Sequence, residues 1–221
     1  MSLIIFLSVL TIPQNVEASG MNSEDPGVSD VVTWRVGDKW IYSGAFDPTV
    51  LVKSAGVDAT VGTINGDSTT IVDAINEIDV AGTPTLVYET TSSADFDKGG
   101  VALETYTGNL YIEYRLDEVR RVSDLAKISS DLSLNVRYVP FGISSLTQQI
   151  ADITISTDYD PMSENYDFPL RIGETWNTSY VSSTAWSGSS DYITPFPQPT
   201  SGANHTNWEI TDVGKPVNDL G

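Results

Sequence analysis

The sequence predicts a mainly β protein, built on a curved antiparallel sheet of the half-barrel or sandwich-like kind with one to three short helices. Apolar and polar residues alternate with a period of two over several segments, and turn-forming residues separate those segments. A six-residue pattern that would feed a strand also occurs twice. Together these features predict about seven to ten strands.

The repeated pattern reads arginine, β-branched aliphatic, glycine, acid, any residue, tryptophan, and its copies are residues 35–40 and 171–176. We expect Gly37 and Gly173 to supply a turn geometry that a side chain would hinder, while the acid caps the turn. The tryptophan that ends each copy is expected to anchor the next strand in a core. The pattern therefore predicts two structural corners that superpose, with the indoles of Trp40 and Trp176 buried.

Four segments alternate or are rich in β-forming residues, and we expect them to be half-buried strands. They are residues 85–91, 110–117, 132–138 and 151–159. Glycine-containing turn signals lie between and around them, at residues 65–67, 81–84, 97–100 and 107–109. These signals predict antiparallel hairpins and meanders.

Three segments fit a short helix. Residues 47–53 would begin with Pro48 in the first turn, which is a favoured place for proline. Residues 71–78 have an apolar helical face, but their β-branched residues fit a strand equally well. Residues 116–127 fit a charged helix or a twisted edge strand.

Residues 1–18 have the features of a signal peptide, with a short apolar run, a turn at Pro13 and small residues before a cleavage point after Ala18. The alternative is an N-terminal strand. Residues 19–30 form a polar leader, and residues 31–221 are expected to be one β-rich domain, with a second unit from residue 168 left open. Because the chain stops where a returning strand is expected, we also expect it to be the N-terminal piece of a longer protein. The sequence thus predicts an exported, extracellular or cell-surface protein with no membrane span after cleavage.

Composition excludes several functions. The formal net charge is −19, with 11 lysines and arginines against 30 acids, which argues against a nucleic-acid partner. No cysteine is present, so neither a disulfide nor a lipidated cysteine can form. His205, the one histidine, is expected in a solvated loop, so a serine nucleophile lacks an evident base. We therefore expect no cofactor and no enzyme activity.

A long serine-, glycine- and proline-rich loop is predicted at residues 182–202, because proline at alternate positions disables a strand ladder. Aromatic residues gather in and beside it. Exposed aromatics on a β scaffold can stack on a sugar or hold an apolar ligand. The candidate ligand-binding residues are Trp186, Tyr192, Phe196 and Trp208.

Two acidic segments are candidate calcium sites, because calcium takes oxygen ligands. One contains Asp158, Asp160, Glu164 and Asp167, and the other is a shorter loop with Asp95, Asp97 and Gly99. Neither has EF-hand spacing, and acidic surface turns are the simpler interpretation. A pair of such carboxylates would also be required by a glycosidase, which is the alternative enzymatic function.

Asn177 and Asn204 each begin an Asn-x-Ser/Thr acceptor for N-glycosylation. These acceptors would be used only if the chain is exported by a host that glycosylates. Both remain candidate modification sites.

Two lines of sequence carry a family resemblance, residues 36–42 and residues 168–176. They resemble a pattern in uncharacterised exported proteins and lipoproteins of archaea and bacteria, some of which are similar to LolA/LppX-like half-barrels. The resemblance implies a curved antiparallel sheet with helices on its concave side, able to enclose a lipid. We expect an exported, non-catalytic binding or structural module whose ligand is a lipid or a carbohydrate, with a carboxylate-dependent hydrolase as the alternative.

Overall fold

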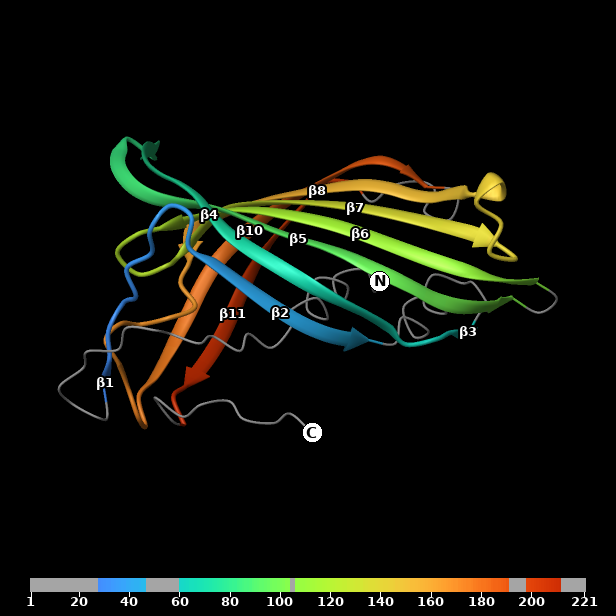
Figure 1. Ribbon diagram of the computed structural model, residues 1–221. Coiled ribbons are helices and arrows are strands. Elements are labelled where there is room, and N and C mark those ends of the chain that lie inside the picture. Colours follow the sequence, from blue (N-terminus) through green and yellow to red (C-terminus); the bar gives the residue numbers. More distant parts are fainter. Residues whose placement is uncertain (1–27, 47–59, 104–105, 191–197, 212–221) are drawn as a thin grey trace.

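The computed structural model describes residues 28–46, 60–103, 106–190 and 198–211. These residues form a nine-stranded sheet and a separate two-stranded ladder, and every pairing is antiparallel. The large sheet is strongly curved (Figure 1). The prediction of a mainly β protein with a curved antiparallel sheet is therefore confirmed.

Most strands are longer than the alternation in the sequence indicated. They are β1 (Val28–Ser29), β2 (Lys39–Phe46), β3 (Thr60–Val61), β4 (Ile64–Val80), β5 (Thr83–Leu103), β6 (Tyr106–Arg121), β7 (Lys127–Pro140), β8 (Gln148–Ser163), β9 (Leu170–Arg171), β10 (Thr175–Ser190) and β11 (Thr200–Glu209). The four predicted strands lie within β5, β6, β7 and β8.

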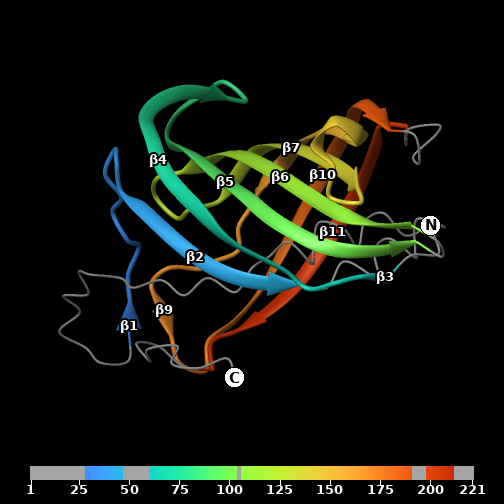
Figure 2. The same ribbon diagram turned by 45° about the vertical axis from the view of Figure 1, so that its right-hand side comes forward.

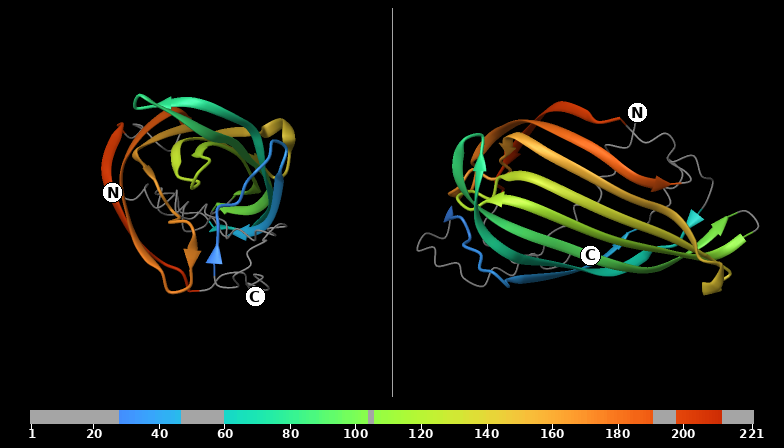
Figure 3. Two further views of the ribbon diagram at one scale, coloured as in Figure 1. Left: turned by 90° about the vertical axis from the view of Figure 1, so that its left-hand side faces the viewer. Right: turned by 90° about the horizontal axis from the view of Figure 1, so that it is seen from above.

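The large sheet is a meander in which β2, β4, β5, β6, β7, β8, β10 and β11 are neighbours in that order, while β3 pairs with β5. Its edges are β2 and β11, and no ladder joins them in the described part of the chain. Figure 2 and the end-on view in Figure 3 show the strands following an arc from β2 to β11. The small ladder pairs β1 with β9, which precede β2 and β10 in sequence, so it links the segments that enter the two sides of the arc.

The sheet buries one face, which is the inner face of the arc. Because directly paired residues share a face, the register brings apolar side chains from successive strands together. One cluster is centred on Ile64, Ala94, Phe96 and Tyr138, and a second on Leu132, Ala151, Ile153 and Ile155. The core therefore lies on the inner face, and the outer face carries mainly polar residues.

A third apolar cluster lies at the end of the sheet that carries the β6–β7 turn. It contains Val72, Tyr88 and Leu125, with Trp34, Trp40, Val122 and Phe168 packed against them. Phe168 belongs to the connection between β8 and β9, and Thr178 of β10 donates a hydrogen bond of 2.6 Å to the Glu164 carbonyl of this connection. The connection thus packs across this end of the sheet.

The two repeated corners make the same hydrogen bonds. In the first, Gly37 N donates to the Val72 carbonyl at 2.8 Å, and Val72 N donates to the Asp38 carbonyl at 3.0 Å. In the second, Gly173 N and Ile210 N make the equivalent bonds at 2.8 and 3.0 Å. Each corner therefore fastens the start of one strand to the backbone of its neighbour.

Both corner glycines have a positive φ, 90° at Gly37 and 81° at Gly173, a region that disfavours a side chain. The acid accepts a hydrogen bond from the arginine N–H three residues earlier, at 2.8 Å in the first corner and 3.1 Å in the second. The indoles of Trp40 and Trp176 are only partly buried, so the expectation of full burial was wrong. Each indole packs on a second tryptophan, Trp34 or Trp208, which covers one side of the ring.

The expected helices are not found in the described residues, which contain only the 3₁₀ turn η1 (Ser144–Leu146). Residues 71–78 belong to β4, and residues 116–127 form the end of β6 and the turn to β7, because cross-strand pairing satisfies their backbone groups. Residues 47–53 lie outside the described residues. No helix in the described ranges is long and apolar enough to span a membrane.

Three of the four glycine turn signals lie inside strands, and only residues 81–84 form a hairpin turn, with φ of 51° at Ala81 and 85° at Gly82. Two of the three signals that lie inside strands contain a glycine for a different physical reason. At Gly66 the neighbouring Phe96 ring occupies the space of the missing side chain, with its Cδ1 only 2.5 Å from where a Cβ would be. Tyr138 covers Gly108 in the same way, so these glycines make room for aromatic rings within the sheet.

The predicted loop at residues 182–202 is mostly strand where it is described. Residues 182–190 belong to β10 and residues 200–202 begin β11, while residues 191–197 lie outside the described residues. The serine- and threonine-rich residues of β10 form a strand because β10 pairs with β8 on one side and with β11 on the other. The leader at residues 19–30 likewise contains β1.

Replacing Gly66 with alanine tests whether this glycine makes room for the Phe96 ring. We expect Gly66→Ala to lower the free energy of unfolding by about 1–3 kcal/mol, because the buried Phe96 ring must move to admit the methyl group. Gly202→Ala is the matched control, since a Cβ there meets nothing within 4 Å and its effect should stay within about 0.5 kcal/mol. Urea unfolding measures both, and equal effects would contradict the explanation.

Candidate binding site on the inner face of the sheet

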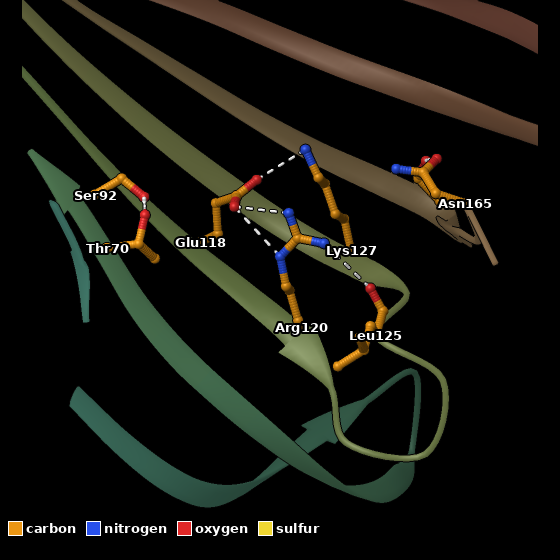
Figure 4. A network of polar contacts seen from close by, with 8 residues as sticks. Thr70, Ser92, Glu118, Arg120, Leu125, Lys127 and Asn165 are labelled. Atoms are coloured by element: carbon orange, nitrogen blue, oxygen red, sulfur yellow. Dashed lines mark hydrogen bonds and ion pairs between the residues drawn. The ribbon is translucent and has the colours of Figure 1, made fainter. Parts of the chain in front are cut away.

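Three charged side chains lie together on the inner face, amid uncharged neighbours. Glu118 and Arg120 occupy inward-facing positions of β6. Lys127, at the start of β7, pairs directly with Arg120. They are the only charged residues at inward-facing positions of β6, β7 and β8. Over these three strands the inner face of a strongly acidic chain therefore has two cations and one anion, and Figure 4 shows them pointing toward one another.

The Glu118 carboxylate binds both cations. Arg120 donates to Glu118 Oε2 from Nη2 at 2.8 Å and from Nε at 3.3 Å, and its Nη1 donates to the Leu125 carbonyl at 3.4 Å. Lys127 Nζ lies 2.8 Å from Oε1 as an ion pair. The described residues give the Lys127 ammonium no other partner, and its side chain is 24 % exposed.

Burial by itself would raise the pKa of Glu118, but the charges of Arg120 and Lys127 and their hydrogen bonds outweigh it and lower the pKa to about 2. Glu118 is therefore ionised at neutral pH. With both cations protonated, the group has a net charge of +1. This positive charge is the electrostatic property of the inner face that a ligand would meet.

A band of hydroxyl groups surrounds the ions. Along the row of paired residues that contains Glu118, the inward-facing neighbours are Thr90, Ser130, Thr157 and Thr184. Thr157 and Thr184 share a hydrogen bond of 3.1 Å. Thr70 and Ser92, in the neighbouring row that contains Leu116, share one of 2.7 Å (Figure 4). The polar band in the row of Glu118 therefore crosses the sheet from β5 to β10, and on β4 the row ends at the buried Val72.

The next row toward the other end of the sheet is apolar from β6 to β10. Its inward-facing residues are Leu116, Leu132, Ile155 and Trp186, which are paired in that order across β6, β7, β8 and β10. Successive inward-facing residues on a strand lie about 7 Å apart. The inner face thus changes from ionic to apolar over a distance shorter than the length of a small amphipathic molecule.

Tyr159 borders the ionic group. Burial raises the pKa of its phenol, the hydrogen bond with Ser130 lowers it, and the Glu118 charge raises it further. The hydroxyl is therefore protonated at neutral pH and adds another neutral polar group to the band.

Trp186 and Trp208, two of the four aromatic residues proposed as one ligand-binding group, lie far apart in the structure. Trp208 pairs with Trp176 at the start of β10, whereas Trp186 pairs with Ile155 near the other end of that strand. Ten residues of strand, about 34 Å, separate the two positions. Trp186 packs on the apolar inner face and Trp208 stacks on Trp176, while Tyr192 and Phe196 lie outside the described residues.

The first set of acidic candidates is not grouped into a metal-binding cluster among the described residues. Asp158 and Asp160 lie at exposed positions of β8, and Asp167 is exposed in the following connection. Glu164 forms an ion pair of 2.6 Å with Arg121. In the parts of the chain that are described, no three Asp, Glu or His residues are grouped so as to hold a metal ion. The side chains of Asp95 and Asp97 lie outside the description.

His205 lies on β11, where a loop had been expected, because this segment pairs with β10. Its Nδ1 is 2.8 Å from the hydroxyl of Ser179, the residue directly opposite. Both side chains are exposed, which places the contact on the surface. Asn177 is exposed, whereas Asn204 donates to the Ser182 hydroxyl at 2.9 Å, so the two glycosylation candidates are in different environments.

Sequence reasoning missed the ionic group. Glu118 and Arg120 continue the alternation of Leu110 to Leu116, and extending that period by four residues would have placed them inward. The interpretation of residues 116–127 as a charged helix or a twisted edge strand hid these two inward-facing positions. The pairing with Lys127 depends on the β6–β7 turn and its register.

Comparisons of the chain with protein-family models, with curated proteins and with solved structures give no significant match. The site must therefore be interpreted from its own geometry.

The lowered pKa of Glu118 predicts a pH effect on stability. In the unfolded chain this carboxyl has its ordinary pKa of 4.5, so its ionised form stabilises the fold above that pH, and the contribution is lost as pH falls toward about 2. The full contribution is roughly 3 kcal/mol. Glu118→Gln should therefore be much less stable than the native chain at pH 7, and the difference should shrink toward pH 2.

Chemical denaturation between pH 2 and pH 7 measures this difference. Asp131→Asn, which removes an exposed acid from β7, is the control and should show a small difference at every pH. A difference between native chain and Glu118→Gln that does not change with pH would contradict the assignment.

Proposed function

We propose that the protein is an exported, non-catalytic binding module, and that its inner face holds an amphipathic ligand with an apolar chain and one anionic group. The main support is the ionic group of net positive charge beside the apolar row of Leu116 and Leu132. Lys127 would bind the anionic group, since its ammonium has a single partner among the described residues. The apolar chain would lie along the row that ends at Trp186.

The chemistry of the two parts favours a lipid over a carbohydrate. Apolar surface gains free energy by leaving water, and a charged hydrogen bond in a partly buried place fixes the orientation of the ligand. A sugar site built from the two candidate tryptophans would require them near one another, but Trp186 lies near one end of β10, and Trp208 of β11 pairs with Trp176 at the other end. The resemblance to LolA/LppX-like half-barrels agrees with a lipid ligand, although those proteins carry helices on the concave side and the described residues here have none.

The hydrolase alternative has less support. A glycosidase requires two carboxyl groups within about 10 Å of each other in a shared cleft. Glu118 is the one buried carboxylate among the described residues, and its two ion pairs hold it ionised. Such a group lacks the second carboxyl that the mechanism needs.

Titration with oleate and with oleyl alcohol tests the ligand class. We expect the protein to bind oleate more tightly than the alcohol, and Lys127→Met to weaken oleate binding at least about tenfold, because one charged hydrogen bond contributes about 1.5–3 kcal/mol. The same substitution should leave the affinity for oleyl alcohol unchanged. Isothermal titration calorimetry provides the affinities, and mass spectrometry of extracts from natively purified protein would identify the natural ligand.

Lys39→Met is the matched control. It removes the same charge from an exposed position on β2, so it alters the net charge without touching the inner face. Oleate affinity should remain that of the native chain. Failure of both probes to bind would refute a lipid-binding module.

Export is the second part of the proposal and depends on residues 1–18, which lie outside the described residues. Intact-mass measurement of the protein recovered from its native host should give a chain that begins at Ser19. A cell-internal protein that retains Met1 would contradict export.

A further inference from the structure

The turn between β7 and β8 exposes three large apolar side chains at one end of the sheet. Phe141 is 58 % exposed, Ile143 49 % and Leu146 46 %. The turn projects at the end of the sheet opposite the β6–β7 turn, on the right in Figure 1. We call these three residues and the backbone between them the apolar tip.

The backbone of the apolar tip is held by hydrogen bonds. Phe141 N donates to the Thr107 carbonyl of β6 at 2.8 Å, and Ile143 N donates to the Pro140 carbonyl at 3.0 Å. Leu146 N donates to Ile143 at 2.9 Å within the 3₁₀ turn, which contains no buried residue. The three side chains are therefore displayed on an ordered support, and little conformational entropy would be lost on binding.

The segment that forms the apolar tip is itself uncharged. No Asp, Glu, Lys or Arg occurs from residue 138 to residue 151, in a chain with 11 basic and 30 acidic residues. Burying this segment would therefore take no charged residue of its own out of water, and such a charge is the main barrier to entering a lipid interface. The rest of the chain is strongly acidic, so an anionic surface would repel it.

We propose that the apolar tip inserts into the surface of an uncharged, zwitterionic lipid membrane and holds the protein there reversibly. Three exposed apolar side chains within six residues of one turn are a small surface, which suits a deformable lipid surface better than the broad complementary area of a stable protein interface. Exposed apolar groups that gather in one place mark an interaction site. The inference concerns a surface distant from the ionic group and does not depend on the ligand proposed for the inner face.

Flotation of the protein with phosphatidylcholine vesicles tests the proposal. We expect the native chain to float with these vesicles, and the variant Phe141→Ser/Ile143→Ser/Leu146→Ser to bind at least about tenfold more weakly, because its buried apolar area is lost. Vesicles that contain phosphatidylglycerol should bind the native chain less well at low salt. Far-UV circular dichroism and thermal unfolding verify that each variant is folded.

The matched control is Val36→Ser/Ile41→Ser/Ile172→Ser, which removes three equally exposed apolar side chains, at 60, 59 and 54 %, from other parts of the surface. It should bind vesicles as the native chain does. An equal loss in both triple variants, or no binding of the native chain to phosphatidylcholine, would overturn the proposal. Self-association in sedimentation velocity that only the tip variant abolishes would overturn it in favour of a second copy as the partner.

Discussion

The fold depends on one constraint: a single antiparallel sheet must bury its own inner face. The described residues contain no α-helix to cover that face, and the chain contains no cysteine to cross-link it. Curvature meets the constraint, because it brings inward-facing side chains of distant strands closer together. Register shifts occur in β4, β5, β6, β7 and β8, and such bulges bend and twist strands. Glycines that admit aromatic rings, as Gly66 admits Phe96, allow the same bending without a loss of packing.

Once the sheet is curved, its two ends differ. At the β6–β7 end, the third apolar cluster and the connection before β9 pack across the sheet, and the two corner units tie β2 and β10 to their neighbours. At the other end the β7–β8 turn presents its apolar side chains to solvent. The ionic group lies between the packed end and the apolar rows. This polarity along the strands connects the two proposals, since a lipid carrier that rests on a membrane would meet its ligand there.

Glycine shows where local sequence and tertiary structure compete. The signals at residues 65–67 and 107–109 are ordinary turn signals, yet both lie within strands because an aromatic ring from the adjacent strand fills the space above the glycine. At residues 81–84 no such ring is present, and the chain turns with a positive φ at Ala81 and Gly82. A glycine in a sequence indicates conformational freedom. Whether that freedom serves a turn or a close contact depends on the residue opposite, which the sequence does not name.

The alternation of residues 110–117, 132–138 and 151–159 determined the fold class and the inward face of three strands, because period-two patterning acts within each strand. The repeated corners were equally local, since a positive φ at glycine and a carboxylate three residues from a backbone N–H need no distant partner. The candidate site was not local. Lys127 meets Glu118 only through the β6–β7 register, and Trp186 is separated from Trp208 only because β10 and β11 pair as one long hairpin. Tertiary structure decided these contacts because cross-strand register sets which side chains become neighbours.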